Sequence, residues 1–394
     1  MGISTIKEQV KKVAIKGINS IGISSKYIGC PKSMLTTKAW IDKYGSQYKA
    51  TFLPLIPATT INEKPPVTLE PSVHRMFEDE YIHEAPAAFV AAIANARVWG
   101  RNGTVIAPND ILLTDVSREF GAYGGVIGKA HSVNKQLSLH KCTKLKGKIA
   151  VLGTAGTYNY HHWLYDTIAR VHLLKLAGVF DHIDNFIIDF NGLSFQKEAL
   201  QQAGIPIEKV ICANDNWRFH IEAEFLIIPS LPSKLGQIGI WPVQFLRDTF
   251  LQKTLDVPTR LYISRRKATS RKLVNEEEVL RFLQSEGFIE FFPEDHSIVE
   301  TASYFSKANY IVGVHGSGFA NLAFIGKGTK VIDIVAPAHL DPYYWMLSNR
   351  NHSHYGYLFG EGERPNENQD LVKTKVDKDI LVDLCKLKKL YKVL

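Results

Sequence analysis

The segment NYIVGVHGSGFANLAF, residues 309–324, indicates a strand that runs through a glycine-rich turn into a helix. The apolar strand ends among three glycines, Gly313, Gly316 and Gly318. Glycines at such a turn let backbone N–H groups approach a phosphate closely, and a helix N-terminus adds about half a positive charge. The spacing is not G-x-G-x-x-G, so a plain NAD site is a weak interpretation. The segment predicts a parallel α/β fold with an anion-binding turn; a tight turn without a ligand is the alternative.

Polar residues near this turn favour the phosphate interpretation. His315 and Asn321 add side-chain donors at the same turn. Asp333 lies twenty residues after Gly313, at the expected end of the next strand, where a carboxylate can accept from ribose hydroxyls. A hydrolase that uses Ser317 is not favoured, because its nucleophile elbow needs G-x-S-x-G and position 315 is His.

Strands and amphipathic helices alternate over two blocks of the chain, which divide near residue 238. The first block has expected strands at 148–153, 185–190, 209–212 and 225–230, with helices at 160–177 and 194–203. The second has strands at 260–265, 288–292, 309–314 and 330–335, with helices at 275–286, 297–308 and 318–325. Such alternation produces parallel sheets covered on both faces. We expect an α/β protein with two Rossmann-like domains facing a central cleft.

The expected domains are residues 1–238 and residues 239–375, followed by a basic amphipathic helix at 376–394. Residues 58–73 are rich in Pro and Thr and predict a connector without periodic structure.

The positive charge of the chain is concentrated in its two tails. The 394 residues are 45% hydrophobic and 22% charged, as in a globular protein, and the net charge is +8. Residues 1–16 hold four Lys and one Glu, and residues 373–394 hold seven Lys and three Asp. The body between them is nearly neutral, which does not favour nucleic-acid binding. Each tail predicts a basic amphipathic helix that either packs on the body or attaches to an anionic membrane surface.

Cysteine usage and the N-terminus indicate a cytoplasmic protein, with possible peripheral attachment at the inner face of the plasma membrane. The cysteines lie far apart, without a C-x-x-C pair or metal-ligand spacing. Lysines interrupt the N-terminal segment, which therefore lacks the apolar core of a signal peptide. The sequence contains no apolar run near the roughly 20 residues that a bilayer crossing needs.

A cationic loop follows the first strand of the second block, in the segment YISRRKATSRK at residues 262–272. The carboxyl end of a parallel strand is the edge where doubly wound sheets bind ligands, and Arg recognises phosphate with two donors. This loop is expected to hold a diphosphate, and a solvated loop is the alternative. Its cations are Arg265, Arg266, Lys267, Arg271 and Lys272.

The first block has a polar helix of its own, TYNYHHWLYDTIAR at residues 157–170. If the segment is helical, His162, Asp166 and Arg170 follow one another at intervals of four and share one face. A His with a carboxylate one turn away can act as an oriented base. A polar cluster at a helix start is an equally good interpretation.

Three segments together, NYHHWLYDTIAR, YISRRKATSRKLVNEEEV and GVHGSGFANLAFIGKGTKVID, resemble glycosyltransferase family 61. The likeness covers about residues 85–335. Relatives often have Gln where this chain has Glu300, and Glu where it has Asp333. The matching positions are His162, Asp166, Arg170, Ser264, Arg265, Arg271, Asn275, His315, Gly316, Gly318 and Asn321.

The resemblance implies a GT-B architecture and an inverting transfer from a nucleotide-sugar donor, with UDP favoured. It implies a glycan or lipid-linked glycan as the acceptor, in cell-surface polysaccharide biosynthesis, as in bacterial capsule-type members. It implies no cofactor and no metal, and the sequence shows no D-x-D triplet after an apolar strand. A non-catalytic basic protein that binds membranes or polyanions is the alternative. We expect the base to be His162, oriented by Asp166, or Asp166 itself. On the acceptor side we expect Arg170, Asn159 and His161, and on the donor side Ser264, Arg265, Arg271, His315, Gly316, Ser317, Gly318, Asn321 and Asp333.

Overall fold

The computed structural model describes residues 3–20, 22–121, 124–214, 218–252, 255–364 and 379–394, and the chain folds into two compact units. Unit 1 comprises Met1–Pro57 and Ala87–Pro232, and unit 2 comprises Ala58–Pro86 and Ser233–Leu394. The two units differ from the expected division, because Ala58–Pro86 groups with the C-terminal unit. The expected boundary at 375/376 lies outside the described residues. The helices of unit 1 are α1 (Ile3–Ser20), α2 (Thr37–Tyr44), α4 (Tyr160–His162), α5 (Arg170–Leu176) and α6 (Ser194–Ala203).

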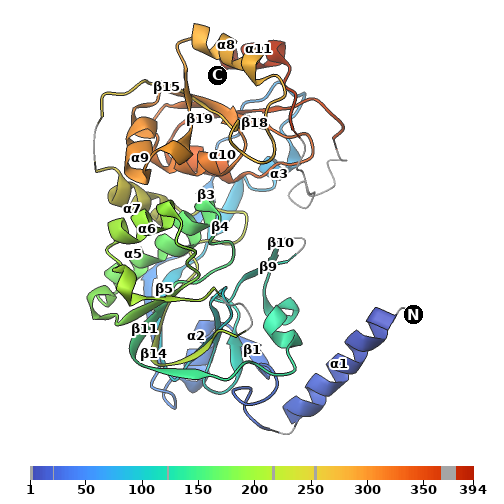
Figure 1. Ribbon diagram of the computed structural model, residues 1–394, viewed down its shortest axis with the longest axis vertical. Coiled ribbons are helices and arrows are strands. Elements are labelled where there is room, and N and C mark those ends of the chain that lie inside the picture. Colours follow the sequence, from blue (N-terminus) through green and yellow to red (C-terminus); the bar gives the residue numbers. More distant parts are fainter. Residues whose placement is uncertain (1–2, 21, 122–123, 215–217, 253–254, 365–378) are drawn as a thin grey trace. The chain divides into compact units, whose positions relative to one another are not determined.

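Within its described residues, unit 1 contains a ten-stranded mixed sheet (Figure 1). Four strands of it, in the order β14-β11-β12-β13, are parallel and match the strands expected from the sequence. The pairs β14–β5, β14–β6, β6–β7, β7–β8 and β2–β5 are antiparallel, so the sheet is not the wholly parallel one that was expected. The strands are β1 (Ser33–Leu35), β2 (Thr51–Ile56), β5 (Ala88–Ala94), β6 (Arg97–Trp99), β7 (Thr104–Ile106), β8 (Ile111–Leu113), β11 (Thr143–Val151), β12 (Asn185–Ile188), β13 (Val210–Cys212) and β14 (His220–Pro229), and β9 (Glu119–Gly121) pairs separately with β10 (Gly124–Val126).

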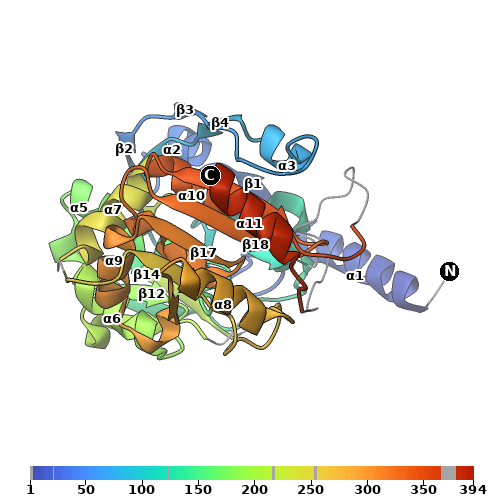
Figure 2. The same cartoon turned by 90° about the horizontal axis from the view of Figure 1, so that it is seen from above.

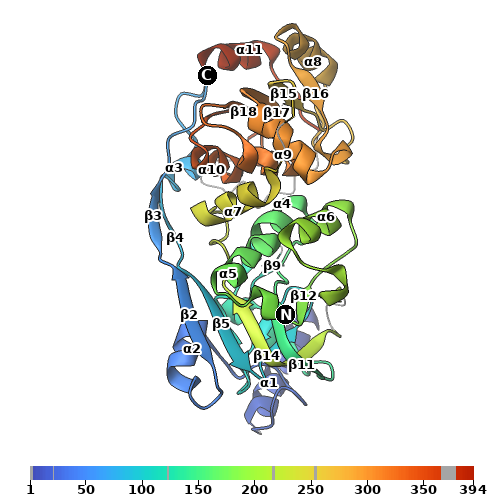
Figure 3. The same cartoon turned by 90° about the vertical axis from the view of Figure 1, so that its left-hand side faces the viewer.

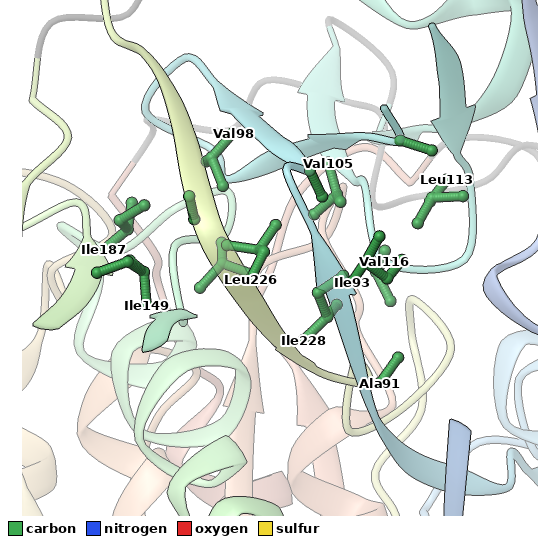
Figure 4. Packing of buried hydrophobic residues seen from close by; sticks show 14 of the residues in the cluster. Ala91, Ile93, Val98, Val105, Leu113, Val116, Ile149, Ile187, Leu226 and Ile228 are labelled. Atoms are coloured by element: carbon green, nitrogen blue, oxygen red, sulfur yellow. The ribbon is translucent and has the colours of Figure 1, made fainter. Parts of the chain in front are cut away.

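Buried side chains on one side of this sheet form the main core of unit 1. Ile149, Ile187 and Leu226 come from parallel strands, and Ile93 comes from an antiparallel one (Figure 4). Trp40 of α2 belongs to the same core and is fully buried. The core therefore joins the parallel and antiparallel strands into one body.

Unit 2 contains, among its described residues, a five-stranded parallel sheet in the order β16-β15-β17-β18-β19. Four of these strands confirm the sequence expectation, and β19 and α10 were not expected. Helices α8 and α11 lie on one side of the strands and α9 and α10 on the other, as Figures 1 and 3 show. The elements are β15 (Arg260–Ile263), β16 (Ile289–Phe291), β17 (Tyr310–Val314), β18 (Lys330–Val335), β19 (His354–Phe359), α7 (Ile240–Phe250), α8 (Glu276–Ser285), α9 (Ile298–Lys307), α10 (Tyr343–Arg350) and α11 (Leu384–Val393).

Helix α11 packs on unit 2 and does not present its apolar side to solvent. Leu387 and Leu390 are fully buried in one core with Val279 and Leu283 of α8 and Ile332 of β18. Figure 2 shows α11 and α8 in front of the strands of this unit. The C-terminal helix therefore follows the packed alternative of the sequence interpretation.

The segment expected as a connector, residues 58–73, is part of unit 2. It contains β3 (Thr59–Asn62), and α3 (Arg75–Glu78) and β4 (Ile82–Ala85) follow it. The Glu63 carboxylate is buried and accepts hydrogen bonds from Arg350 of α10. Burial opposes its ionisation, but the His83 hydrogen bond and Arg350 hold the pKa of Glu63 below its ordinary value. A buried ion pair between residues far apart in the chain is invisible to local sequence patterns, which explains the incorrect expectation.

Candidate active site

The unit 2 sheet changes direction at one pair of strands, and two of the expected motifs meet there. The chain passes from β15 to β16 on one side and then returns to β17 on the other. In open α/β sheets, ligands bind outside the carboxyl ends of the strands at such a switch point. The loop of Ser264–Arg271 follows β15, and His315 and Gly316 follow β17. The topology therefore brings the cationic loop and the glycine turn to the same edge.

Arg265 and Arg271 supply a positive charge at this edge that no described carboxylate neutralises. Within the described residues, neither guanidinium lies within ion-pair distance of an Asp or Glu. Burial and the nearby Arg271 lower the pKa of Arg265. Arg271 has a φ of 55°, a left-handed conformation that is uncommon outside Gly and that concentrates at functional sites. No described carboxylate is in ion-pair contact with either cation, and Glu294 acts on Arg265 from a longer distance, so the two arginines are suited to bind an anion.

Two other cations of the loop are paired with carboxylates. Arg266 contacts Glu276, Glu277 and Glu290. Lys267 pairs with the Asp295 carboxylate. The expected five-cation cluster is therefore reduced to Arg265, Arg271 and Lys272, and Arg265 is the one that lies against the glycine turn.

Gly316 lets the Arg265 guanidinium lie directly against the backbone of the turn. A Cβ atom at position 316 would collide with Nη1 of Arg265. The φ of Gly316 is 173°, which any residue can adopt, so space rather than conformation requires the glycine. The 3-10 helix Ser317–Phe324 begins here, and the first N–H groups of a helix have no partner within it. Guanidinium and backbone donors thus lie side by side.

His315 is held in one orientation by two buried residues. Its Nδ1 lies 2.8 Å from Oδ2 of Asp333, and the Tyr355 hydroxyl donates to the same oxygen at 2.7 Å. Asp333 is the fourth residue of β18 and fully buried, opposite Gly313 of β17. It does not end its strand as was expected, and its carboxylate is directed at His315. Tyr355 was missed because β19 was not expected.

The pKa of His339 reflects its burial and the positive charge of the same site. Its ring centroid lies 5.6 Å from that of His315. Burial, His315 and the charges of Arg271 and Arg265 together lower the pKa of His339 to about 3. His339 is therefore neutral near pH 7, and the arginines carry the charge.

Two expected donor residues support the loops of the site. The Ser264 hydroxyl donates to Oε1 of Glu276 at 2.7 Å and accepts from the Arg266 N–H, which fixes the start of the cationic loop. Asn321 is fully buried and donates to the Gly318 carbonyl at 3.0 Å, which fixes the turn. The two side chains therefore stabilise the backbone of the cationic loop and of the glycine turn.

Unit 1 has a second switch point, and the polar helix begins beside it. The chain passes from β11 through β12 and β13 and returns to β14 on the other side of β11. His162 of α4 and Asp166 of the following turn confirm the shared helix face, because Nδ1 of His162 lies 2.8 Å from Oδ2 of Asp166. Burial opposes ionisation of Asp166, but His162, Arg118 and His161 hold its pKa below the ordinary value. The pair consists of an imidazole and an ionised carboxylate.

The Arg170 guanidinium forms its hydrogen bonds away from this pair, although its charge interacts with that of Asp166. Residues Trp163–Ile168 form a π-helical turn, which takes an extra residue and so interrupts the α-helical interval of four. The buried Arg170 guanidinium donates to the Gly153 carbonyl at 3.4 Å and the Pro229 carbonyl at 2.6 Å. It therefore ties the loop after β11 to the carboxyl end of β14.

The remaining expected acceptor residues have local roles in the structure. Asn159 caps α4, because its side chain accepts from the His161 N–H at 2.9 Å. His161 is buried and stacks on Tyr165 with ring centroids 4.7 Å apart. Sequence reasoning missed Asp189, which follows β12 at the same edge and accepts from Arg101 at 2.8 Å. Its place directly after an expected strand was the available signal.

Gly156 allows the backbone before α4 to approach the imidazole of His162. Its φ is 81°, and a Cβ atom there would lie 2.8 Å from the His162 ring and 2.7 Å from the Phe120 ring. We expect Gly156→Ala to displace the imidazole and to reduce catalytic activity, while the left-handed backbone also costs about 1 kcal/mol of folding free energy.

Gly192→Ala is the matched control for this prediction. Gly192 has a φ of 75°, and the closest atom to its Cβ position is Cε of Lys197 at 4.0 Å. In thermal unfolding Gly192→Ala should show the backbone cost alone and Gly156→Ala that cost plus the cost of displacing the two rings, and Gly156→Ala alone should lose activity. Equal activity in the two variants would contradict the placement of His162 in the site.

Among the described residues, no group of three or more His, Cys, Asp or Glu side chains is arranged to hold a metal ion.

A comparison with known families gives one match. The family model described as Glycosyltransferase 61 matches residues 160–332. The matched segment begins in the helix of His162 and ends in β18, so it contains both switch-point motifs. The match supports a glycosyltransferase and agrees with the resemblance seen in the sequence. No curated protein matches the chain.

Proposed function

We propose that this protein is an inverting glycosyltransferase that uses a nucleoside-diphosphate sugar, with UDP as the favoured nucleotide. The observation that carries the proposal is the pair Arg265 and Arg271, which lies at the β15/β17 switch point without a described carboxylate partner. A diphosphate offers the two negative groups that such a pair, the Gly316 turn and the first N–H groups of the next helix can bind. The family match supports a glycosyltransferase.

The transfer needs charge stabilisation on the departing diphosphate. In this proposal Arg265 and Arg271 provide it, and such preorganised charges lower reaction barriers by several kcal/mol. His315 lies at the same edge, and its orientation is fixed by Asp333 and Tyr355. Because fixed cations occupy this role, we propose that the reaction is independent of metal ions.

The transfer also needs a base for the acceptor hydroxyl. We assign this role to His162, with Nδ1 engaged by Asp166 so that Nε2 is left to take the proton. Asp166 then stabilises the imidazolium that forms. One base and one stabilised leaving group are what a single displacement with inversion requires. The proposal also includes a GT-B arrangement of the two units and a glycan or lipid-linked glycan acceptor of cell-surface polysaccharide biosynthesis. Because all four cysteines are free, we also propose a reducing compartment for the protein.

Thermal unfolding with UDP, GDP, CMP and a polynucleotide tests the proposal. We expect one nucleoside diphosphate to raise the unfolding temperature, and we expect EDTA to leave that shift unchanged. A response to the polynucleotide alone would support the alternative of a non-catalytic polyanion-binding protein and overturn the proposal.

A further inference from the structure

Helix α1 has two apolar sides, and the fold uses one of them. At about 100° per residue, Ile15 lies roughly opposite Val10, Val13 and Gly17, and Ile18 lies about 100° to one side of them. Ile15 and Ile18 are half-buried, and α1 contacts the 3-10 turn Ser132–Lys135 of the same unit. This side attaches the helix to unit 1.

The opposite side of α1 is open. Val10 is 64% exposed and Val13 is 70% exposed, and a Cβ atom at Gly17 would have no neighbour within 4 Å. We name Val10, Val13 and Gly17 the α1 stripe. An apolar stripe of a stable helix that the fold leaves uncovered indicates an interaction surface.

Lysines border the α1 stripe on one side. At about 100° per residue, Lys16 lies about 60° from Val13 and Lys12 lies further round on the same side, whereas Lys11 lies between Ile15 and Ile18. All three are exposed, and none forms an ion pair with a described residue. Their long side chains can extend from an apolar surface toward phosphate groups. This arrangement matches the headgroup layer of a membrane that contains anionic lipids.

A second copy of the chain fits the α1 stripe less well than a lipid surface does. Pairing two such helices through this stripe would bring the flanking lysines of both copies together. Glu8 is the one described carboxylate on α1. The charge pattern therefore favours an anionic partner over self-association.

The C-terminal helix gives an internal comparison of similar composition. Its apolar side is buried in unit 2 through Leu387 and Leu390, and Lys386 pairs with Glu361. Lys389 and Lys392 remain exposed but flank no open apolar stripe. Of the two basic tails, α1 is thus the one that combines exposed lysines with an exposed apolar stripe, as binding to a membrane surface requires.

We propose that α1 binds the surface of an anionic lipid bilayer, with the α1 stripe in the headgroup region and Lys12 and Lys16 on anionic headgroups. Within the part of the chain that the structure describes, no helix is long and apolar enough to cross a bilayer. The inference does not depend on the catalytic proposal.

The test is co-sedimentation of the full chain with vesicles of phosphatidylcholine, with and without phosphatidylglycerol. We expect binding that requires phosphatidylglycerol and weakens with added salt. Two double variants should each weaken vesicle binding by at least about tenfold: Val10→Ser with Val13→Ser, and Lys12→Glu with Lys16→Glu. All four side chains are exposed, so the fold of unit 1 should persist, which circular dichroism checks.

Lys389→Glu with Lys392→Glu is the matched control, because it makes the same change of charge on α11. We expect this variant to bind within about threefold of the unchanged protein. Equal losses from the two lysine variants would show attraction by net charge alone and would overturn the proposal. A lack of binding to phosphatidylglycerol vesicles, or a dimer in sedimentation velocity that the valine variant dissociates, would also overturn it.

Discussion

Replacing Arg265 with Ala should reduce kcat/KM for sugar transfer by about 10²–10³, as expected for the loss of a preorganised charge on a leaving group. Arg265 lies against the Gly316 turn at the β15/β17 switch point, with Arg271 as its neighbouring cation. Without it the diphosphate loses both a charge and a planar pair of donors. Arg265→Lys should recover part of the activity, because it restores the charge but not the two-donor geometry.

Lys267→Ala is the matched control for this prediction. It removes one positive charge from the same loop, but Lys267 is exposed and engaged with Asp295. We expect its kcat/KM to stay within about threefold of the unchanged protein. Calorimetry with UDP should show weakened binding for Arg265→Ala and little change for Lys267→Ala. Similar losses in both would mean that general charge, and not a built phosphate site, holds the donor.

Replacing His162 with Gln should reduce kcat by about 10²–10⁴, the usual contribution of a general base. A Gln amide can still donate to Asp166, so local packing should be kept, but it cannot take the proton of the acceptor hydroxyl. Nucleotide binding should be unchanged, because the expected donor site lies in unit 2. Steady-state transfer rates together with UDP titrations separate these two effects.

Asp166→Asn tests the partner of that base. The substitution keeps the shape of the side chain and removes the charge that faces Nδ1 of His162. We expect a loss of kcat smaller than that of His162→Gln. A fully active His162→Gln protein would remove His162 from the mechanism and leave Asp166 as the base to test.

Local patterns were sufficient for the parallel strands and for the position of the motifs. Short apolar runs bounded by turns located β11–β14 and β15–β18, and strand order then placed the cationic loop and the Gly316 turn at one edge. The interval of four between His162 and Asp166 predicted the contact between their side chains. These features depend on neighbours in the chain, and sequence reasoning resolves such features well.

Features that depend on distant partners could not be predicted. Arg266 and Lys267 look like ligand-binding cations until Glu290 and Asp295 are seen beside them. The Arg170 guanidinium forms its hydrogen bonds away from His162 and Asp166, and no residue pattern in the sequence indicated the π-helical turn that precedes it. In each case a contact or a backbone irregularity changed the role of a side chain.

The segment Ala58–Pro86 shows the same limit at the level of domains. The Pro and Thr content of residues 58–73 indicated a connector, but Glu63 there is buried and paired with Arg350. Just after this stretch, Phe77 is fully buried and packs on Trp345 of α10 with ring centroids 5.3 Å apart. Such a segment joins a unit through a few large side chains and one buried ion pair rather than through periodic structure.

The most direct test of the account is incubation with a panel of nucleotide sugars, with release of the free nucleotide as the measurement. We expect one donor, most readily a UDP-sugar, to release its nucleotide, with the same rate in EDTA and a rate lower by about 10² or more in Arg265→Ala. Release that needs a divalent cation, or a rate that Arg265→Ala leaves unchanged, would contradict the assignment of the arginine pair to the donor diphosphate.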